Sequence, residues 1–392
     1  MAATALPRGW TWDDVLNRLE EHADLDAGAR EHGAIKRRRV IRSGAQLLRL
    51  VLVYVLGGLS LRSTVAWAEA AGEASLSDVA LLKRLRNCGP WLGHLVATLN
   101  SALNPEASCE ANLETGGRRV VAVDASAIAS PGGQDKSYSL LHTVYDIGAQ
   151  RFRTTLVTGR AVAEHLDLGT VEKGEIRLGD RVYGRYRDLA AVTGAGADYV
   201  VRLSANALRL ESAEGTQLRR ATACGRAERE GVQDVAVVIA DNAGRPPLSA
   251  RMIVLPLPPE QAEAARRQMR RNASKAGYTP SADALATAGC LLLITSLPAA
   301  DWPATRVLEL YRRRWQVELA YKRLKSLLDL EQLRAYDPDL VNAWIHAVLL
   351  FALLIDLERP SAKTERPDSP RSEQATPGPS HGPYPCGATS PF

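Results

Sequence analysis

The pattern that most limits the possible folds begins at Arg118, where strand signals replace helical periodicity. Residues 120–123 form a short, mostly β-branched apolar run, V-V-A-V, which is typical of a buried central strand. Two more strands follow, and the I-G-A-Q between them is a hairpin signal. The series continues as helix, strand, helix and strand, which completes a mixed sheet with helices packed against it and predicts an α/β fold. The later elements are predicted at 139–146, 151–158, 162–168, 175–178, 185–193 and 199–203.

The segment before this sheet, residues 1–110, reads as an all-helical region. Helices are predicted at 12–21, at about 34–56, from 60 to 72, and at 78–87, where Ser75 or Ser77 can supply the N-cap. The last two helices, separated by a turn containing glycine, resemble a helix-turn-helix. The second of them carries three cations, so we expect this region to bind DNA, although a small helical bundle would show the same pattern. The cations are Lys83, Arg84 and Arg86.

The order of strands and helices breaks down after the first part of the sheet domain, which we place at 111–205. Residues 206–288 contain short strands at 234–239 and 251–255 and a polar helix at 260–276, and we interpret them as a β-rich insertion. A strand at 290–295 returns the chain to the sheet domain, whose second part is predicted at 289–358. The last segment, 359–392, is rich in proline, serine and charge, and we expect it to be a disordered tail.

Near the end of the sheet domain, residues 311–325 read Y-R-R-R-W-Q-V-E-L-A-Y-K-R-L-K, which we predict to be one long helix. At about 100° per residue, one carboxylate, two cations and a phenol fall within a strip about 60° wide. A carboxylate held among cations on a rigid element suits a metal ion and a phosphate chain. A solvated helix with favourable i,i+4 pairs would also have this pattern. The four residues of the strip are Tyr311, Arg314, Glu318 and Lys325.

Three carboxylates occupy equivalent positions along this predicted fold. Asp124 ends the first strand, Asp180 ends a later strand of the same sheet, and Glu318 lies on the helix after the sheet. Ligands gather where strands end at one edge of an α/β sheet. Convergent carboxylates bind Mg²⁺, and two such ions about 4 Å apart can activate an attacking water and stabilise the leaving oxygen in phosphodiester cleavage. Each aspartate alone would more often be a turn former or a helix cap.

Composition adds limited information about partners and compartment. The net charge of +5 and several arginine-rich runs, such as 36–39 and 312–314, favour an acidic partner, although solvated helix faces would explain any one run. The five cysteines are scattered, which argues against a zinc site or a disulfide framework and favours a reducing cytosol. The apolar runs 50–61 and 343–355 are shorter than the roughly 20 residues that span a bilayer, so we expect buried helices and no membrane partner.

Taken together, these motifs resemble the DDE transposases of the insertion-sequence-4 family over roughly residues 40–357. The motif V-V-A-V-D ends at Asp124, and G-D-R-V-Y-G contains Asp180, with Val182 where the family usually has glycine. The most specific motif is the Y-x2-R-x3-E-x6-K signature, which falls at Tyr311, Arg314, Glu318 and Lys325.

The resemblance implies an RNase H-like catalytic core that uses two Mg²⁺ ions, for which Mn²⁺ can substitute. The implied metal ligands and catalytic residues are Asp124, Asp180 and Glu318. Hydrolysis at each transposon end would free a 3′-hydroxyl that attacks target DNA.

On the DNA side, the resemblance implies that Arg314 and Lys325 grip phosphates, as a fork and as a point charge. Tyr311 would position the DNA backbone or a ligand through its hydroxyl group. The implied partners are double-stranded DNA, as terminal inverted repeats and as target, and a second copy of the chain in a homodimer on DNA. A bacterial cytoplasmic protein associated with the nucleoid would meet these requirements.

Two other functions remain open at this point. A metal-dependent nuclease of the same fold would share the three carboxylates but would not need the phosphate clamp. A catalytically inactive or truncated remnant would only bind DNA, and the unusual sequence of residues 359–392 is what a frameshifted copy would show.

Overall fold

The computed structural model describes residues 10–103, 115–129, 138–159, 161–204, 208–241, 243–327 and 333–357, and the predicted tail at 359–392 lies outside them. The N-terminal helices are α1 (Trp12–Glu20), α2 (Leu25–Glu31), α3 (Gly44–Leu56), α4 (Leu61–Ala70), α5 (Asp78–Arg86) and α6 (Gly89–Leu103). Next come β1 (Val120–Ala129), β2 (Tyr138–Asp146), β3 (Arg151–Gly159), β4 (Ile176–Gly179), the 3-10 helix η2 (Arg181–Tyr183), α7 (Tyr186–Gly194) and β5 (Asp198–Arg202). The remaining elements are β6 (Arg209–Glu211), α8 (Arg220–Glu230), β7 (Gln233–Ala240), β8 (Leu248–Pro256), α9 (Pro259–Lys275), α10 (Ala282–Ala288), β9 (Cys290–Thr295), α11 (Ala304–Arg312), α12 (Trp315–Leu327) and α13 (Pro338–Leu357).

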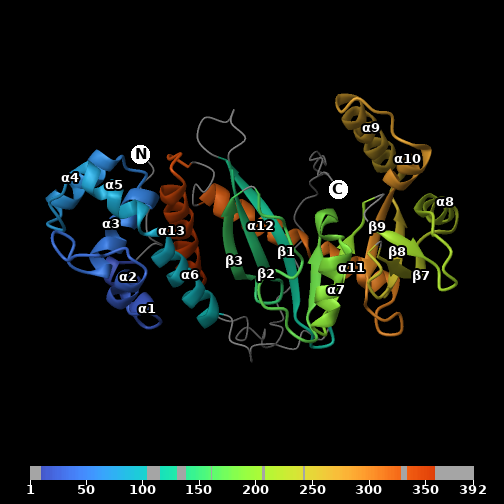
Figure 1. Ribbon diagram of the computed structural model, residues 1–392, viewed down its shortest axis with the longest axis horizontal. Coiled ribbons are helices and arrows are strands. Elements are labelled where there is room, and N and C mark those ends of the chain that lie inside the picture. The colour runs from blue at the N-terminus through green and yellow to red at the C-terminus, as the bar shows by residue number, and fades with distance from the viewer. Residues whose placement is uncertain are drawn as a thin grey trace, which may run out of the picture. The chain divides into compact units, whose positions relative to one another are not determined.

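One mixed sheet organises the molecule, with the strand order β3-β2-β1-β4-β5-β9-β8-β7-β6 (Figure 1). The first three strands are antiparallel neighbours, whereas β4 runs parallel to β1 and β5 runs parallel to β4. The crossover from β1 to β4 passes through β2 and β3, and α7 connects β4 to β5. The prediction of a mixed α/β fold with helices flanking the sheet is therefore confirmed, and the arrangement is consistent with an RNase H-like core.

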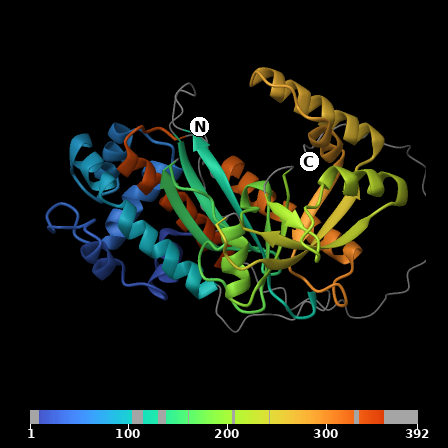
Figure 2. The same ribbon diagram turned by 45° about the vertical axis from the view of Figure 1, so that its right-hand side comes forward.

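The segment predicted as an insertion adds strands to this same sheet. Strands β6, β7 and β8 form an antiparallel series that joins β5 through β9. Helix α9 extends away from the sheet in both ribbon views (Figures 1 and 2), whereas α10 contacts α8 and β9. The strands predicted at 234–239, 251–255 and 290–295 therefore belong to one continuous sheet with β1, β4 and β5.

Alternating side chains of β1 enter two separate apolar cores. Val120 and Ala122 belong to the core that also contains α12, α13 and the N-terminal helices. Val121 and Val123 face the opposite core, which contains residues of α7 and α8. Because side chains alternate along a strand, every sheet residue can be assigned to one of these faces. We call them the α12 face and the α7 face.

Helix α13 connects the N-terminal helices to the sheet. It packs along α6, contacts α3 and α5, and touches β3, which α6 also contacts (Figure 1). Among the described residues, α13 is the one helix long and apolar enough to cross a membrane, but 67% of its apolar window is buried inside the protein. Its neighbours are therefore other helices, as predicted for the apolar run 343–355.

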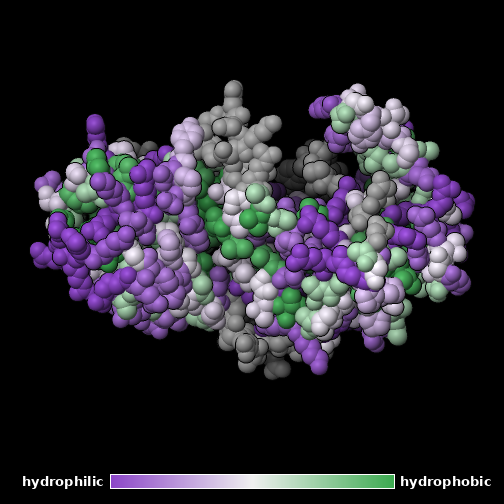
Figure 3. Space-filling model, viewed as in Figure 1, coloured by the Kyte–Doolittle hydropathy of each residue, from purple (hydrophilic) through white to green (hydrophobic). Residues whose placement is uncertain are grey.

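On the face shown in Figure 3, hydrophilic residues gather over the N-terminal helices.

Several local predictions differ from the structure. The helix expected from about residue 34 begins only at Gly44, where Ser43 caps it and accepts from the Gln46 N–H. The preceding run of four cations, 36–39, lies outside any helix, where like charges are further apart. The helix expected at 162–168 is also absent, because a buried arginine, Arg177, binds backbone carbonyls that a helix would need. Helices α2 and α6 were not predicted.

Candidate functional site

Asp124 and Asp180 lie level with each other on neighbouring strands. The parallel register pairs Val120 with Ile176 and Ala122 with Leu178, and its continuation by two residues brings the aspartates together. Parallel neighbours are about 4.8 Å apart, and residues of equal parity share one face of the sheet. Both carboxylates therefore belong to the α12 face. This position at the end of β4 is the one predicted from the strand pattern.

Glu318 reaches the same place from α12, which packs along β1. The buried Tyr321 anchors the helix, since its hydroxyl lies 3.0 Å from the Asp124 carbonyl oxygen and 3.1 Å from that of Leu141. It also exchanges a 2.7 Å hydrogen bond with the Thr143 hydroxyl on β2. Because Tyr321 is one turn beyond Glu318, these contacts hold the glutamate over the middle of β1, near Asp124.

The predicted single helix from 311 to 325 is wrong, because the chain turns between α11 and α12. The N–H of Arg314 donates to the Tyr311 carbonyl, and the N–H of Val317 donates to that of Arg314, so tight turns replace the α-helical pattern here. The turn places the Arg314 guanidinium 2.5 Å from Glu318 and 3.8 Å from Asp124. Two of the three carboxylates therefore share one half-buried cation, which the helical strip alone did not show.

Burial and neighbouring charges both act on the ionisation of Asp124. Burial, together with the charges of Glu318 and Asp180, raises the pKa of Asp124 to about 7, although Arg314 and the Ala125 N–H oppose the increase. Such a carboxyl group is held in a position where a positive charge is favourable. One arginine does not balance three carboxylates, so the group of four carries excess negative charge.

Asp180 has an unsatisfied buried atom. Its Oδ1 is buried and has no hydrogen-bond partner among the described residues. A buried carboxylate oxygen without a partner is costly, and a bound cation would remove that cost. Together with Asp124 and Glu318, it forms a set of hard oxygen donors that suits a divalent metal ion. These three residues fit a metal site.

The other two residues of the predicted strip lie on either side of this centre. Lys325 donates to the Ala127 carbonyl on β1 over 3.4 Å, further along the same strand as Asp124. Tyr311 is buried, and burial together with the charge of Asp180 raises its pKa to about 12, so the phenol keeps its proton. The Arg314 guanidinium lies 5.9 Å from the centre of the Tyr311 ring. Tyr311 is therefore packed beside Arg314, and its buried hydroxyl group has no hydrogen-bond partner among the described residues.

Three residues of the site were not predicted from the sequence. Arg202 lies near Arg181, Tyr311 and Asp180, since burial and Arg181 lower the pKa of Arg202 while Tyr311 and Asp180 raise it. Trp315 is 39% exposed on the helix that carries Glu318, and the Lys322 ammonium group lies 5.0 Å from the centre of its ring. An aromatic residue inside a basic run was a usable signal for Trp315, whereas Arg202 lies far from the motifs in sequence.

Comparison with known proteins identifies the family. Residues 115–355 match the family described as Transposase DDE domain. The chain is 41% identical over 353 residues to the transposase InsL for insertion sequence element IS186A of Escherichia coli K12, which covers 88% of this chain and 93% of that protein. It is also 41% identical, over 354 residues with the same coverage, to the transposase for insertion sequence element IS421 of Escherichia coli. The chain belongs to the DDE transposases. These relatives are members of the insertion-sequence-4 family, so the predicted resemblance is confirmed.

Membership carries three conclusions for this transposase. It is an enzyme that cleaves and transfers DNA, it binds DNA, and it uses divalent metal ions. The functional prediction made from the sequence is therefore confirmed at this level. Membership does not by itself identify the residues that carry out each step.

Proposed function

We propose that this transposase cleaves the ends of its element and joins each freed 3′-hydroxyl to target DNA at a centre formed by Asp124, Asp180 and Glu318. The observation that supports this most directly is the convergence of three carboxylates around a buried, unpartnered aspartate oxygen, with one arginine beside them. Two Mg²⁺ ions held there, or Mn²⁺ in their place, would supply the polarisation of the scissile phosphate and of the attacking oxygen.

The protein's own residues would orient the reacting DNA. Arg314 is held by Asp124 and Glu318, so its fork is fixed before a phosphate arrives and little entropy is lost on binding. Lys325, which lies on α12 and donates to the Ala127 carbonyl of β1, would contact the next part of the DNA backbone as a point charge. Tyr321 fixes the distance between helix and strand and so keeps Glu318 aligned with the aspartates.

We further propose that residues 1–110 bind the terminal inverted repeats, with α5 as the helix that enters the major groove. Helices α4 and α5 are in contact across a short turn, and Ser77 caps α5. Val79 near the start of α5 is 56% exposed, and Lys83 lies one turn further along in an exposed position. Recognition helices contact bases with side chains near their N-terminus. The exposed basic run 36–39 is adjacent, since Arg84 donates to the Arg37 carbonyl.

Two copies of the chain are needed to cut and join two element ends, so we propose a homodimer on DNA. The partners are then double-stranded inverted repeats and target DNA, with no membrane involved. We infer that the protein acts in the bacterial cytoplasm and is associated with the nucleoid when it is bound to DNA. We also propose that the catalytic domain consists of a first part at 111–205, an insertion at 206–288 and a second part at 289–358.

Replacement of Lys83 tests the proposed role of α5. We expect Lys83→Ala to weaken binding of an inverted-repeat duplex and to lower the salt slope, −d log K/d log[salt], by about 1, because one phosphate contact is lost. Fluorescence anisotropy between low and moderate salt measures both. The matched control is Lys275→Ala, an exposed lysine at the end of α9, which should leave the slope unchanged. An unchanged slope for Lys83→Ala would exclude α5 from the DNA contact.

The raised pKa of Asp124 predicts how stability depends on pH in metal-free protein. The carboxyl ionises near pH 4 when unfolded and at about 7 when folded, so between these values the folded state binds more protons. The contribution of Asp124 therefore lowers stability as pH rises from 4 to 7, by at most about 1.4 kcal/mol per pH unit. Urea unfolding of the wild type and of Asp124→Asn at several pH values measures this difference. Equal pH dependence of the two proteins would show that Asp124 is not buried among carboxylates.

A plasmid carrying the inverted repeats separates the possible activities. With Mg²⁺, the proposed function yields excised ends and joined product from the purified protein. Nicks without joined product would indicate a nuclease of the same fold, and a gel shift without cleavage would indicate an inactive DNA-binding remnant. Only the first result agrees with the proposal.

A further inference from the structure

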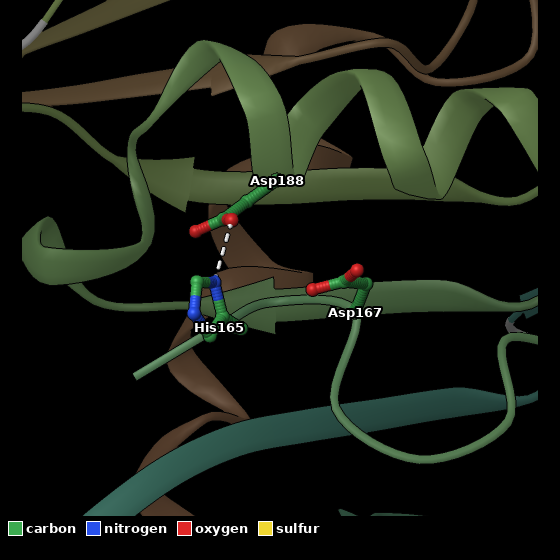
Figure 4. A group of neighbouring side chains, drawn as sticks. All are labelled: His165, Asp167 and Asp188. Carbon is green, nitrogen blue, oxygen red and sulfur yellow. Dashed lines mark hydrogen bonds and ion pairs between the residues drawn. The ribbon is translucent and has the colours of Figure 1, made fainter. Parts of the chain in front are cut away.

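A second group of potential metal ligands lies on the α7 face of the sheet. His165 and Asp167 come from the loop before β4, and Asp188 lies in the first turn of α7. One ligand atom from each residue lies within 4.8 Å of the others. Figure 4 shows the Asp188 carboxylate directed from α7 towards His165, with Asp167 beside them, and Asp188 Oδ1 is 3.0 Å from His165 Nδ1.

Asp188 gives this group a feature that a chance cluster of acidic residues lacks. Its side chain is only 1% exposed, and its second carboxylate oxygen, Oδ2, is buried without a hydrogen-bond partner among the described residues. A single half-exposed histidine does not satisfy a fully buried carboxylate. His165 and Asp167 are both partly exposed, so an ion can reach Asp188 from solvent.

We propose that His165, Asp167 and Asp188 bind one divalent transition-metal ion, of the class of Zn²⁺ or Mn²⁺. A set of one imidazole and two carboxylates suits such ions, whereas Mg²⁺ prefers oxygen donors alone. Metal–ligand distances of about 2.1 Å place two adjacent ligand atoms about 3 Å apart, which matches the separation of His165 and Asp188. The ion would replace their direct hydrogen bond with two metal bonds.

This site is separate from the proposed catalytic centre. Leu166, between two of the ligands, and Leu189, next to the third, belong to the core of the α7 face, whereas Asp124 and Asp180 belong to the α12 face. The loop nevertheless packs against the residue before Asp180, because Leu166 Cδ1 lies only 3.0 Å from the position of a Cβ at Gly179. A metal that ties the 165–167 loop to α7 therefore holds the turn that carries Asp180 from both sides.

The number of bound ions tests the proposal with full-length protein. Asp124→Ala combined with Glu318→Ala removes two of the three proposed catalytic ligands, and Mn²⁺ binding to this double variant is counted by electron paramagnetic resonance. We expect one ion per chain to remain. Addition of His165→Ala should weaken that binding by about tenfold or more, because one of three protein ligands is lost. Asp167→Asn, which keeps the size of the side chain, should do the same, and His22→Ala, at an exposed histidine near α1, should not.

Each result has a definite meaning. Loss of all bound Mn²⁺ in the double variant, or unchanged binding after His165→Ala and Asp167→Asn, would overturn the second site. If wild type and double variant instead bind equal numbers of ions, the catalytic assignment fails while the second site stands. Mn²⁺ should raise the melting temperature of the double variant. If this rise is absent after Asp167→Asn is added to the double variant, the ion stabilises this part of the fold.

Discussion

We expect Asp180→Asn to reduce cleavage of element ends by at least about 100-fold while the protein still binds the same DNA. Residues that only orient a metal ligand cost about 10- to 100-fold when they are replaced, and a direct ligand costs more. The amide keeps the shape of the aspartate but presents one neutral oxygen in place of a charged one. Its Oδ1 position is the buried, unpartnered atom at the centre of the site. Cleavage of a labelled inverted-repeat duplex in Mg²⁺ provides the measurement.

The control for this prediction must be another carboxylate near the same elements. Asp301 precedes α11 and is exposed, so Asp301→Asn should keep full activity. A gel shift with the inverted repeat establishes that Asp180→Asn folds and binds DNA. Cleavage within about tenfold of the wild type would show that Asp180 is not a metal ligand, even though the chain remains a DDE transposase.

The sheet and two of its carboxylates could be predicted because their signals are local. An apolar run followed directly by an aspartate occurs at Asp124 and again at Asp180. Asp180 follows the last residue of β4 as predicted, whereas the prediction that Asp124 ends its strand is wrong, because β1 continues to Ala129. Parallel pairing then brings equivalent positions together without any further information. Glu318 could be predicted only as part of a helix motif, because the contacts that place it come from Tyr321 and strands far away in the sequence.

The prediction of one continuous helix failed because the charges inside the site outweigh local helical preference. Three successive arginines, 312–314, would repel one another along a helix, whereas the turn lets Arg314 reach Asp124 and Glu318. Arg202 escaped prediction for a related reason. It ends a strand that carries no recognisable motif, and only the folded sheet brings it near Asp180.

Strand β4 carries the most buried charged side chain in the described structure, although its sequence pattern does not predict that burial. E-I-R-L alternates polar and apolar residues, which normally predicts one solvent-facing side of a strand. In the structure, both polar residues are covered, since Arg177 is fully buried and Glu175 is 1% exposed. The cover is the irregular loop before β4, where a helix was predicted.

Replacement of Arg177 should produce the largest loss of stability among single substitutions in this region. Its guanidinium binds Glu175 at 2.6 Å and donates to three loop carbonyls, at 2.7, 2.8 and 2.7 Å. Removal of one partner from a buried ion pair costs about 3–5 kcal/mol, because the remaining charge loses its partner. We therefore expect Arg177→Met to lower the free energy of unfolding by about 3–5 kcal/mol in urea denaturation. The carbonyls that lose a donor belong to Leu166, Leu168 and Thr170.

The control variants separate loss of this network from loss of any arginine. Arg229→Met changes an exposed residue of α8 and should alter stability by less than about 0.5 kcal/mol. Arg177→Lys keeps the charge but cannot reach Glu175 and three carbonyls together, so it should also destabilise the protein. Glu175→Gln added to Arg177→Met should recover part of the loss, because the uncompensated carboxylate is then absent, although Arg153 also binds Glu175 at 2.7 Å. A loss of less than about 1 kcal/mol for Arg177→Met would mean that the loop holds its position without this residue. Since the same loop carries His165 and Asp167, the position of the proposed second metal site depends on the result.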